Sequence, residues 1–319
     1  MKYRFVGDSG IQVSSIGLGS WLTVESHGQD VSDALHRTAY ESGVNFFDTS
    51  DVYGNGRTEG MVGKSLAEFR RDTYVLATKV FFPCSPHPFP GVNDRGLSRK
   101  HIFEKCENSL RELQTEYIDL YQCHRYDEAT PLRETCRAMN DLIAQGKILY
   151  WGVSQWTADQ IRHAVSICDE HDWPRPISNQ PQYNMLQREA EAEVMPTCAE
   201  LGLSLVVYSP LAQGVLTGKY CKGENPPPDS RAADSKDGQW MAKVLADENL
   251  DRVEQLRAVA SGLRLTVGQL ALAWCLRRKE LASCIVGATK TSQLAENVKA
   301  GDVELDESTQ DQIKMIFGE

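Results

Sequence analysis

The sequence lacks an excess of basic residues. Its 319 residues include 34 Lys and Arg against 44 Asp and Glu, which gives a formal charge of −10. Binding to nucleic acid or to an anionic membrane surface depends on Lys and Arg side chains that neutralise phosphates. Both are therefore poor candidates as partners, and a small-molecule ligand is the better hypothesis.

Paired cysteine motifs are also lacking, although nine cysteines are present. The cysteines are scattered and odd in number, and they form no C-x-x-C pair. Several lie within apolar segments such as YIDLYQC and LASCIVG, where a free thiol packs as a small hydrophobic group. We therefore expect reduced cysteines and no structural metal.

Long hydrophobic runs are absent as well. No stretch approaches the ~20 apolar residues that a membrane helix needs. The opening segment MKYRFVGDSGIQVSSIGLG lacks the apolar centre of a signal peptide. We expect no membrane insertion and a cytoplasmic location. With 41% hydrophobic and 24% charged residues, the chain has the composition of a globular protein that can bury a large core.

Short apolar segments alternate with longer amphipathic ones along most of the chain. A β-hairpin is predicted first, with RFV and QVSSIG joined by GDSG. Eight strands are then predicted at SIGLG, VNFFD, YVLATK, IDLYQC, ILYWGVS, PISNQ, SLVVYS and SCIVG. Helices are predicted over 31–43, 58–69, 98–114, 131–145, 157–172, 188–201, 266–279 and 291–300. Their ends are marked by Ser98 as N-cap, Thr157 with Gln160 as a capping box, and Gly301 as C-cap.

Eight βα units predict one α/β domain over residues 1–319, a (β/α)8 TIM barrel with an N-terminal β-hairpin and a long loop after strand 7. Strands that are apolar throughout form a parallel sheet covered by helices, and eight of them close into a barrel. A doubly wound Rossmann sheet is the alternative. It expects G-x-G-x-x-G, whereas IGLGSWL supplies Gly17 and Gly19 and then Leu22. The segment CKGENPPPDSRAADSKDG is too long for a plain connection, so it is either a functional lid or a disordered insert.

Four polar residues follow three successive predicted strands. Asp48 and Tyr53 follow VNFF, Lys79 follows YVLAT, and His124 follows YIDLYQC. Taken singly, each has a structural alternative: a turn aspartate, an aromatic residue covering the barrel mouth, a surface lysine and a hydrogen-bonded histidine. Because barrel active sites lie where strand C-termini meet the following loops, we expect the four side chains to converge at one rim.

The four side chains suit the reduction of a carbonyl group. This reaction needs a hydride source, which no side chain provides, and a proton donor for the developing alkoxide. Tyr53 is the expected donor, with the ammonium group of Lys79 lowering the pKa of the phenol. Asp48 would keep Lys79 charged and in place, and His124 would orient the carbonyl.

On these residues the sequence resembles the aldo-keto reductase superfamily, whose tetrad is Asp, Tyr, Lys and His in this order. FFDTSDVYGNGRTE and YVLATKV carry the match, and the resemblance spans residues 3 to 317. GLSRKHI, YWGVSQW, YSPLAQGVLTGKY and IVGATKTSQLAEN are similar to the branch that contains the potassium-channel β subunits. The resemblance implies NADPH-dependent reduction of aldehydes or ketones to alcohols, with Tyr53 as general acid.

The resemblance also implies a site for NADPH or NADP+ across the barrel mouth. By matching position, Tyr208 stacks on the nicotinamide, and Ser154 and Gln180 bind its carboxamide. Other residues implied toward the nicotinamide and the pyrophosphate are Gly19, Trp21, Asp48, Tyr53, Ser209, Pro210, Leu211, Ala212, Gly214, Lys219 and Arg231. The adenosine end is implied to contact Gly287, Thr289, Lys290, Gln293, Glu296 and Asn297.

The charges in this set suit phosphate groups. Lys219, Arg231 and Lys290 can meet phosphate oxygens, and Lys290 precedes a predicted helix whose N-terminus favours an anion. Without the neighbouring motifs, the same three cations would be ordinary loop residues. The preference for NADPH over NADH rests on Lys290 and on the resemblance.

The substrate pocket and the biological role are less sharply defined. Aromatic residues on loops around the expected site predict an apolar entrance, although they also suit simple packing: Trp21, Phe81, Phe82 and Trp156. Alternative functions are a channel β-subunit-like regulatory protein and an NADP(H) sensor with little turnover. In either case, and for the enzyme too, the resemblance implies a homo-oligomer, a tetramer. The short segment before the hairpin and the presence of His124, where that branch can have asparagine, favour the enzyme. Gln155 departs from the arginine that is common in that branch.

Overall fold

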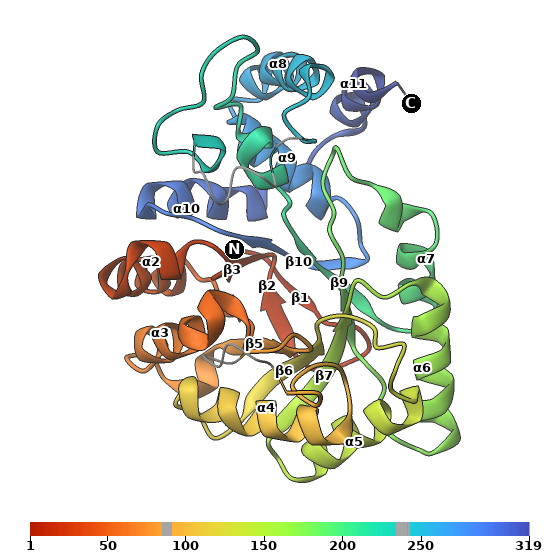
Figure 1. Ribbon diagram of the computed structural model, residues 1–319. Helices are drawn as coiled ribbons and strands as arrows, with labels where there is room; N and C mark the ends of the chain where they lie inside the picture. The colour runs from red at the N-terminus through yellow and green to blue at the C-terminus, as the bar shows by residue number, and fades with distance from the viewer. Residues whose placement is uncertain (85–90, 234–240, 242, 319) are drawn as a thin grey trace.

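Eight parallel strands close into a barrel, as the sequence predicts. The structure is a computed structural model, and it describes residues 1–84, 91–233, 241 and 243–318. The strands follow one another around the barrel in chain order, and the last pairs with the first (Figure 1). Their bounds are β3 Ile16–Gly19, β4 Phe46–Asp48, β5 Val75–Val80, β6 Ile118–Cys123, β7 Ile148–Ser154, β8 Ser178–Gln180, β9 Ser204–Tyr208 and β10 Leu281–Val286.

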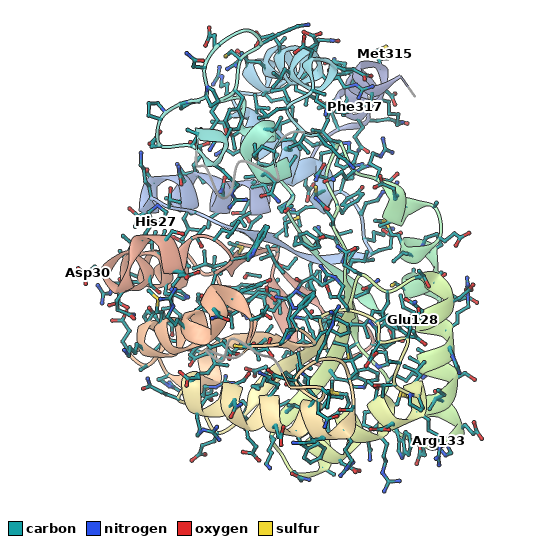
Figure 2. The ribbon with its side chains drawn as sticks, viewed as in Figure 1. His27, Asp30, Glu128, Arg133, Met315 and Phe317 are labelled. Carbon is teal, nitrogen blue, oxygen red and sulfur yellow. The ribbon has the colours of Figure 1, made fainter. Side chains whose placement is uncertain are left out.

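Helices surround the barrel (Figure 1). Those that the sequence predicts are α2 Gln29–Glu41, α3 Arg57–Leu66, α4 Arg99–Glu112, α5 Leu132–Ala144, α6 Ala158–Glu170, α7 Val194–Glu200, α9 Val267–Leu276 and α10 Thr291–Val298. Three further helices were not predicted: α1 Val24–His27, α8 Asp247–Gly262 and α11 Glu307–Phe317. Figure 2 shows polar side chains at the outer surface, among them the exposed His27, Asp30, Glu128 and Arg133.

The alternation of side chains along the strands directs the polar residues into the barrel. Phe46, Val75, Ala77 and Leu120 belong to the hydrophobic cluster that fills the barrel interior. Side chains two residues apart on a strand point to the same face. Asp48 therefore points inward after Phe46, Lys79 after Ala77, and Gln122 after Leu120. The barrel interior is apolar in its lower layers and polar toward the C-terminal rim.

A β-hairpin covers the N-terminal end of the barrel, as predicted. It pairs β1 Tyr3–Phe5 with β2 Gln12–Ser14 in antiparallel fashion. Val6 and Val13 belong to the interior cluster, so the hairpin seals the apolar layer. Gly7 has φ of +57°, and a Cβ there would lie 2.5 Å from the carbonyl oxygen of Gly202. Only glycine fits this close approach.

The predicted helix ends are correct in two cases and wrong in one. Ser98 accepts a hydrogen bond from the His101 amide, and Thr157 forms a reciprocal capping box with Gln160. Gly301 does not cap α10, because the chain continues beyond Val298 as the 3-10 helix η7 Lys299–Asp302. A Cβ at Gly301 would lie 2.7 Å from Ser15 Oγ, so the glycine permits close packing.

The connection after β9 contains two short 3-10 helices: η4 Ala212–Thr217 precedes the predicted long segment, and η5 Arg231–Ala233 lies within it. Residues 234–240 of this loop lie outside the described residues. Helix α8 follows it and packs against α11 beside the barrel (Figure 1). Within the described ranges no single helix is long and apolar enough to cross a membrane. The pair α8 and α9 passes by length and composition only when joined, and it is bent by 88°.

Candidate active site

A buried ion pair lies at the centre of the candidate site. Lys79 Nζ donates to Asp48 Oδ1 at 2.6 Å and to the carbonyl oxygen of Thr49 at 2.7 Å. Lys79 is fully buried, and Asp48 is 5% exposed. Although burial alone would favour a neutral amine, Asp48 and Tyr53 raise the pKa of Lys79 above its usual range. Lys79 is therefore an ammonium group that is fixed in position.

Tyr53 is the third member of this group. Its hydroxyl lies 3.3 Å from Lys79 Nζ and accepts a hydrogen bond from it. Burial raises the pKa of the phenol, and the Lys79 ammonium acts against that rise. The net direction is upward, which differs from the lowering that the sequence predicts, because burial outweighs the charge. The phenol is protonated near neutral pH, and its proton is available to an acceptor other than Lys79.

His124 faces the same group from the end of β6. Its ring lies edge-on to Tyr53, with centroids 5.9 Å apart, and edge-on to Phe82 at 5.1 Å. Burial, Lys79 and Arg125 lower the pKa of His124 to about 2. The imidazole is neutral, so it can orient a ligand by hydrogen bonding but is not a reservoir of acid. The structure thus brings the four predicted catalytic residues together at one rim.

The second oxygen of Asp48 is held by two glutamine side chains. Gln122 Nε2 donates to Asp48 Oδ2 at 3.2 Å, and Gln180 Nε2 donates to the same oxygen at 3.0 Å. Gln180 Nε2 also lies 3.2 Å from Gln122 Oε1. Lys79 and these two amides occupy both oxygens of the carboxylate, which holds it in one orientation. Its geometry indicates a role in holding Lys79 and not in contacting a substrate.

The residues expected toward a nicotinamide lie at the C-terminal ends of β7, β8 and β9. Ser154 Oγ donates to the backbone oxygen of Gln180 at 2.9 Å. The hydroxyl of Tyr208 accepts from Gln155 and lies 3.4 Å from Gln182 Oε1. Gly19, at the end of β3, would place a Cβ 2.6 Å from Ile285 Cγ2. These residues lie on neighbouring strand ends, and their contact with a cofactor stays a prediction.

The turn after β9 has an unusual backbone. Ser209, Ala212 and Gln213 have φ of 52°, 47° and 57°, and Gly214 has φ of 93°. Non-glycine residues rarely adopt positive φ, and such strain gathers at sites that bind ligands. Pro210 and Leu211 lie within this turn. The strained backbone therefore fits the binding role that the resemblance implies for these residues.

Three cations lie on the loop that follows this turn and at the N-terminus of α10. Lys290 Nζ pairs with Asp229 Oδ2 at 2.6 Å, which joins the loop after β9 to the N-terminus of α10. Arg231 lies over the Trp21 ring at 5.6 Å and donates to Gln213. Lys219 Nζ lies 5.3 Å from the centroid of the Tyr220 ring. Cations on separate segments beside a strained turn fit the phosphates of a dinucleotide.

The residues expected at an adenosine moiety surround the start of α10. Gln293 Oε1 accepts from the backbone amides of Thr289 and Lys290, at 3.0 and 3.3 Å. Glu296 Oε1 accepts from Thr266 at 2.9 Å. Gly287, Gln293 and Glu296 are exposed, and Asn297 is buried. They form one side of the rim next to β10, and their contact with an adenosine group stays a prediction.

The four aromatic residues predicted at the entrance differ in exposure. Phe81 and Trp156 are 7% and 1% exposed and belong to the core between barrel and helices. The Trp156 ring packs edge-on against Tyr126 at 4.9 Å. Trp21 and Phe82 are half-buried, and Phe82 touches His124. Accessible aromatic surface beside the tetrad thus comes from Trp21 and Phe82, with Phe81 and Trp156 packed behind them.

Several residues of the site were not predicted from the sequence. Gln122 holds Asp48, Gln182 lies beside Tyr208, and Ser50 Oγ lies 3.1 Å from His124 Nδ1. Arg125 lies over the Phe82 ring at 5.5 Å. Gln122 carried a signal, since it is a polar residue at an inward position in an otherwise apolar strand. Ser50 and Arg125 carried none.

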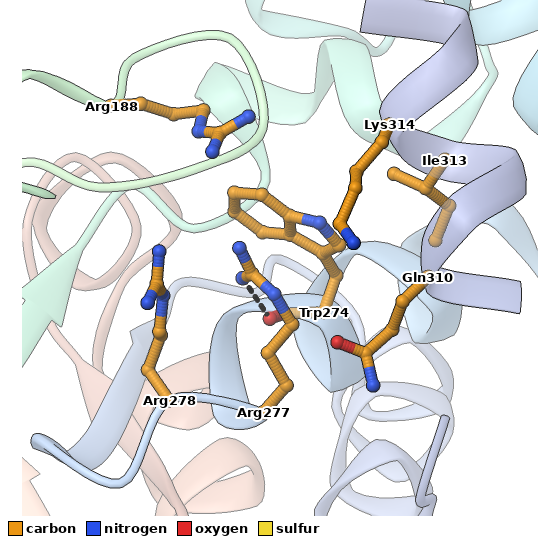
Figure 3. A pocket seen from close by; sticks show the side chains of 7 residues that line it. All are labelled: Arg188, Trp274, Arg277, Arg278, Gln310, Ile313 and Lys314. Carbon is orange, nitrogen blue, oxygen red and sulfur yellow. Dashed lines mark hydrogen bonds between the residues drawn. The ribbon is translucent and has the colours of Figure 1, made fainter. Parts of the chain in front are cut away.

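A separate cavity of about 220 Å³ lies on the flank of the barrel, lined by Arg188, Trp274, Arg277, Arg278, Gln310, Ile313 and Lys314 (Figure 3). Arg277 stacks on Trp274 at 3.6 Å and donates to its carbonyl oxygen at 2.6 Å. Glu191 pairs with Arg188 at 2.7 Å, with Arg278 at 3.1 Å and with Arg277 at 3.5 Å. Because Glu191, the Trp274 ring and the Tyr183 hydroxyl all engage these guanidinium groups, we assign the cluster a structural role.

The fold and the rim geometry define a (β/α)8 barrel that has a lysine, a carboxylate, a phenol and an imidazole at the C-terminal ends of its strands, where barrel enzymes have their active sites. The model of the Aldo/keto reductase family matches residues 15–317. The chain belongs to the aldo/keto reductase family, and this membership implies an oxidoreductase.

Curated relatives of the chain have channel-subunit names. The chain is 43% identical over 308 residues to "Probable voltage-gated potassium channel subunit beta" of Oryza sativa subsp. japonica, covering 95% of this chain and 92% of the relative. Identity and coverage are the same for the protein of that name from Arabidopsis thaliana. A relative from Schizosaccharomyces pombe, described in similar terms, is 39% identical over 324 residues, with 99% and 92% covered.

Proposed function

We propose that this protein is an NADPH-dependent carbonyl reductase that converts aldehydes or ketones to alcohols, with Tyr53 as general acid. One observation carries the proposal: Lys79 Nζ lies 2.6 Å from Asp48 and 3.3 Å from the Tyr53 hydroxyl inside the barrel rim. Because the ammonium group donates to the phenol oxygen, the phenol proton is directed to another acceptor. We assign this catalysis to one barrel domain over residues 1–319, in the cytoplasm.

The side chains divide the proton chemistry among them. The substrate carbonyl oxygen accepts hydrogen bonds from Tyr53 and from neutral His124, which fixes its position. As the oxygen becomes an alkoxide, Tyr53 transfers its proton to it, and the adjacent ammonium of Lys79 stabilises the phenolate that remains. Asp48 keeps Lys79 charged. Return of a proton to Tyr53 restores the site.

The hydride is the part of the chemistry that a bound NADPH would supply. The donor set suits this cofactor, since Lys219, Arg231 and Lys290 have the positive charge that phosphate groups need and lie on segments that follow or face a strained turn. Tyr208, Ser154 and Gln180 would hold the nicotinamide end, and Asn297 with the exposed residues of α10 would hold the adenosine end. The aromatic surfaces of Trp21 and Phe82 favour apolar small-molecule carbonyl substrates.

NADPH oxidation measured with a panel of aromatic and medium-chain aldehydes tests the proposal. Tyr53→Phe should lower kcat by about 10²–10⁴-fold, because the general acid is removed. Its Kd for NADPH should be nearly unchanged. Tyr121→Phe is the matched control, since the buried Tyr121 hydroxyl has no hydrogen-bond partner among the described residues. Equal turnover by Tyr53→Phe and the wild type would refute the assignment of the acid.

A regulatory role on a membrane channel is a second candidate, and the names of the curated relatives favour it. A protein of this kind would bind NADP(H) tightly and respond to its redox state while turning over slowly. Pull-down of a voltage-gated potassium channel from cell extracts, with and without NADPH, tests this role. Rapid aldehyde turnover without channel binding would exclude it, and tight NADPH binding without turnover would favour it over the enzyme.

A further inference from the structure

The hydroxyl of Ser50 lies between the catalytic imidazole and a second buried carboxyl group. Ser50 Oγ is 3.1 Å from His124 Nδ1 and 3.3 Å from Asp51 Oδ1. Ser50 is fully buried, Asp51 is 3% exposed and His124 is 7% exposed. The three groups form a hydrogen-bonded row that runs from the site into the protein. Neither serine nor Asp51 was expected to take part in the chemistry.

The row has two possible directions, because a serine hydroxyl carries a single proton. If Ser50 donates to Asp51, then His124 Nδ1 must carry the ring proton and donate to Ser50. Nε2 is then a bare acceptor, which repels a carbonyl oxygen. If Ser50 donates to Nδ1, the ring proton lies on Nε2, where it can bind a carbonyl oxygen.

The surroundings of Asp51 decide between these directions. Asp51 Oδ2 is buried and has no hydrogen-bond partner among the described residues. An ionised carboxylate with a bare buried oxygen is strongly disfavoured. Burial and the nearby Glu59 raise the pKa of Asp51 well above its usual range, although Lys105 and hydrogen bonding to Ser50 and to the Val52 backbone oppose this rise. A neutral Asp51 can donate its own proton to Ser50.

Other titratable groups near Asp51 do not reverse this balance. Glu59 on α3 is itself buried and accepts from Thr78 and Ser109, and burial raises its pKa to about 7. Lys105 on α4 donates to the carbonyl oxygen of Cys84 at 2.9 Å and pairs with Asp94 at 3.4 Å. The ammonium group is therefore engaged elsewhere.

We propose that Ser50 is a positioning residue that, backed by a protonated Asp51, donates to His124 Nδ1 and thereby holds the ring proton on Nε2. The row then donates in one direction, from Asp51 to Ser50, from Ser50 to His124, and from His124 to the substrate oxygen. Its value for catalysis rests on the proposed carbonyl reduction. The position of the ring proton does not rest on that function. The positioning role of Ser50 and the proposed function can therefore fail separately.

Nitrogen-15 NMR of the His124 ring in the NADP+-bound protein reads the tautomer directly, with His124→Asn identifying the signals. We expect the proton on Nε2 in the wild type. Ser50→Ala should give a mixture of tautomers and lower kcat by about tenfold, because one hydrogen bond that orients the ring is lost. Its Kd for NADPH should stay within twofold of the wild-type value, a ratio that corresponds to about 0.4 kcal/mol.

Asp51→Asn sharpens the test. The amide that this substitution introduces can still donate to Ser50, so the Nε2 proton and most of kcat should be retained. If the row instead required an ionised Asp51, this variant would lose both. Ser178→Ala is the control, because Ser178 is a fully buried barrel serine whose hydroxyl has no partner among the described residues. It should change neither tautomer nor kcat.

Two results would overturn the proposal: a wild-type ring with its proton on Nδ1, or an unchanged tautomer in Ser50→Ala. The first needs no variant, so it decides the question even if Ser50→Ala does not fold. Absence of aldehyde turnover in a wild type that has the Nε2 proton would instead count against the proposed function and leave the positioning role of Ser50 supported.

Discussion

Two carboxylate-centred clusters differ in depth and in the number of cations around them. At the rim, Asp48 is paired with Lys79, and the side chains are 4% and 0% exposed. On the flank, Glu191 is 16% exposed and is shared by Arg188, Arg277 and Arg278, which are 15–35% exposed. Both carboxylates hold cations next to a phenol, but the Tyr183 hydroxyl donates to Glu191, whereas the Tyr53 hydroxyl accepts from Lys79.

The difference shows what makes an ion pair useful for chemistry. In the flank cluster Arg277 donates to the Tyr183 hydroxyl, but that hydroxyl donates its own proton to Glu191, so the phenol has none left for a further group. At the rim, Gln122 and Gln180 saturate Asp48, and the donors of Lys79 are left for Thr49 and Tyr53. Because the pair is buried, removing one partner alone should affect both stability and catalysis.

The largest effect is expected for Lys79→Met. This substitution leaves Asp48 as a buried carboxylate without a cation, which should lower the free energy of unfolding by about 3–5 kcal/mol. It should also abolish measurable turnover, because the phenolate of Tyr53 loses its stabilising charge. Urea unfolding at pH 7 and NADPH oxidation measure the two effects.

The double variant Lys79→Met with Asp48→Asn separates the effect on stability from the effect on turnover. It removes the uncompensated charge, so most of the lost stability should return while turnover stays absent. If the double variant were no more stable than Lys79→Met, the cost would come from lost packing of the lysine stem, and the contrast between the two clusters would lose its electrostatic basis.

A smaller effect on stability and none on turnover are expected for Glu191→Gln. The carboxylate accepts charged hydrogen bonds from arginines, each worth about 1.5–3 kcal/mol, and the neutral amide keeps only part of them. We expect a loss of about 1–3 kcal/mol in the free energy of unfolding at pH 7. The exposed Glu189→Gln is the control and should change nothing. A drop in kcat would show that the flank cluster is coupled to the rim.

The pH dependence gives Glu191 an independent signature. Although burial opposes the shift, Arg188 and Tyr183 lower the pKa of Glu191 from 4.5 to about 2. A lowered folded-state pKa means that the stabilisation is present above pH 4.5 and is lost as the pH falls toward 2. Glu191→Gln should therefore be less stable than the wild type at pH 7, and the difference should shrink at pH 3. A difference that did not depend on pH would contradict this.

Sequence patterns located the barrel well where strands are rich in apolar residues. IDLYQC and ILYWGVS match β6 and β7 at both ends, because most of their residues are apolar and polar segments flank them. Helix α8 was missed because it buries only Val253, Leu256 and Ala260, so its pattern has a weak apolar face. Helix α11 was also missed, and it buries only Thr309 and Ile313.

The site was predictable only where a residue type stands at a strand end. Asp48, Lys79 and His124 were found this way, and their convergence follows from the parallel sheet. Ser50 lies in the loop segment DTSDVYG, and His124, which it contacts, is 74 positions away in the sequence. Such a contact is set by the closure of neighbouring strands, which periodicity does not encode. The direction of the Tyr53 pKa also required burial, which the sequence does not give.

The smallest effect on stability is expected for the exposed pair Lys290–Asp229, whose side chains are 58% and 67% exposed. Exposed ion pairs contribute little, so Lys290→Ala should leave the melting temperature unchanged. If Lys290 binds the 2′-phosphate, this variant should weaken NADPH by about tenfold or more and leave NADH unaffected. Asp229→Asn should do the reverse and keep or tighten NADPH binding, because it frees Lys290 from a competing carboxylate. Fluorescence titration with both cofactors measures this. Equal weakening of NADPH and NADH binding by Lys290→Ala would show that Lys290 contacts the pyrophosphate or supports the loop. The exposed pair would then have no role in selecting NADPH over NADH.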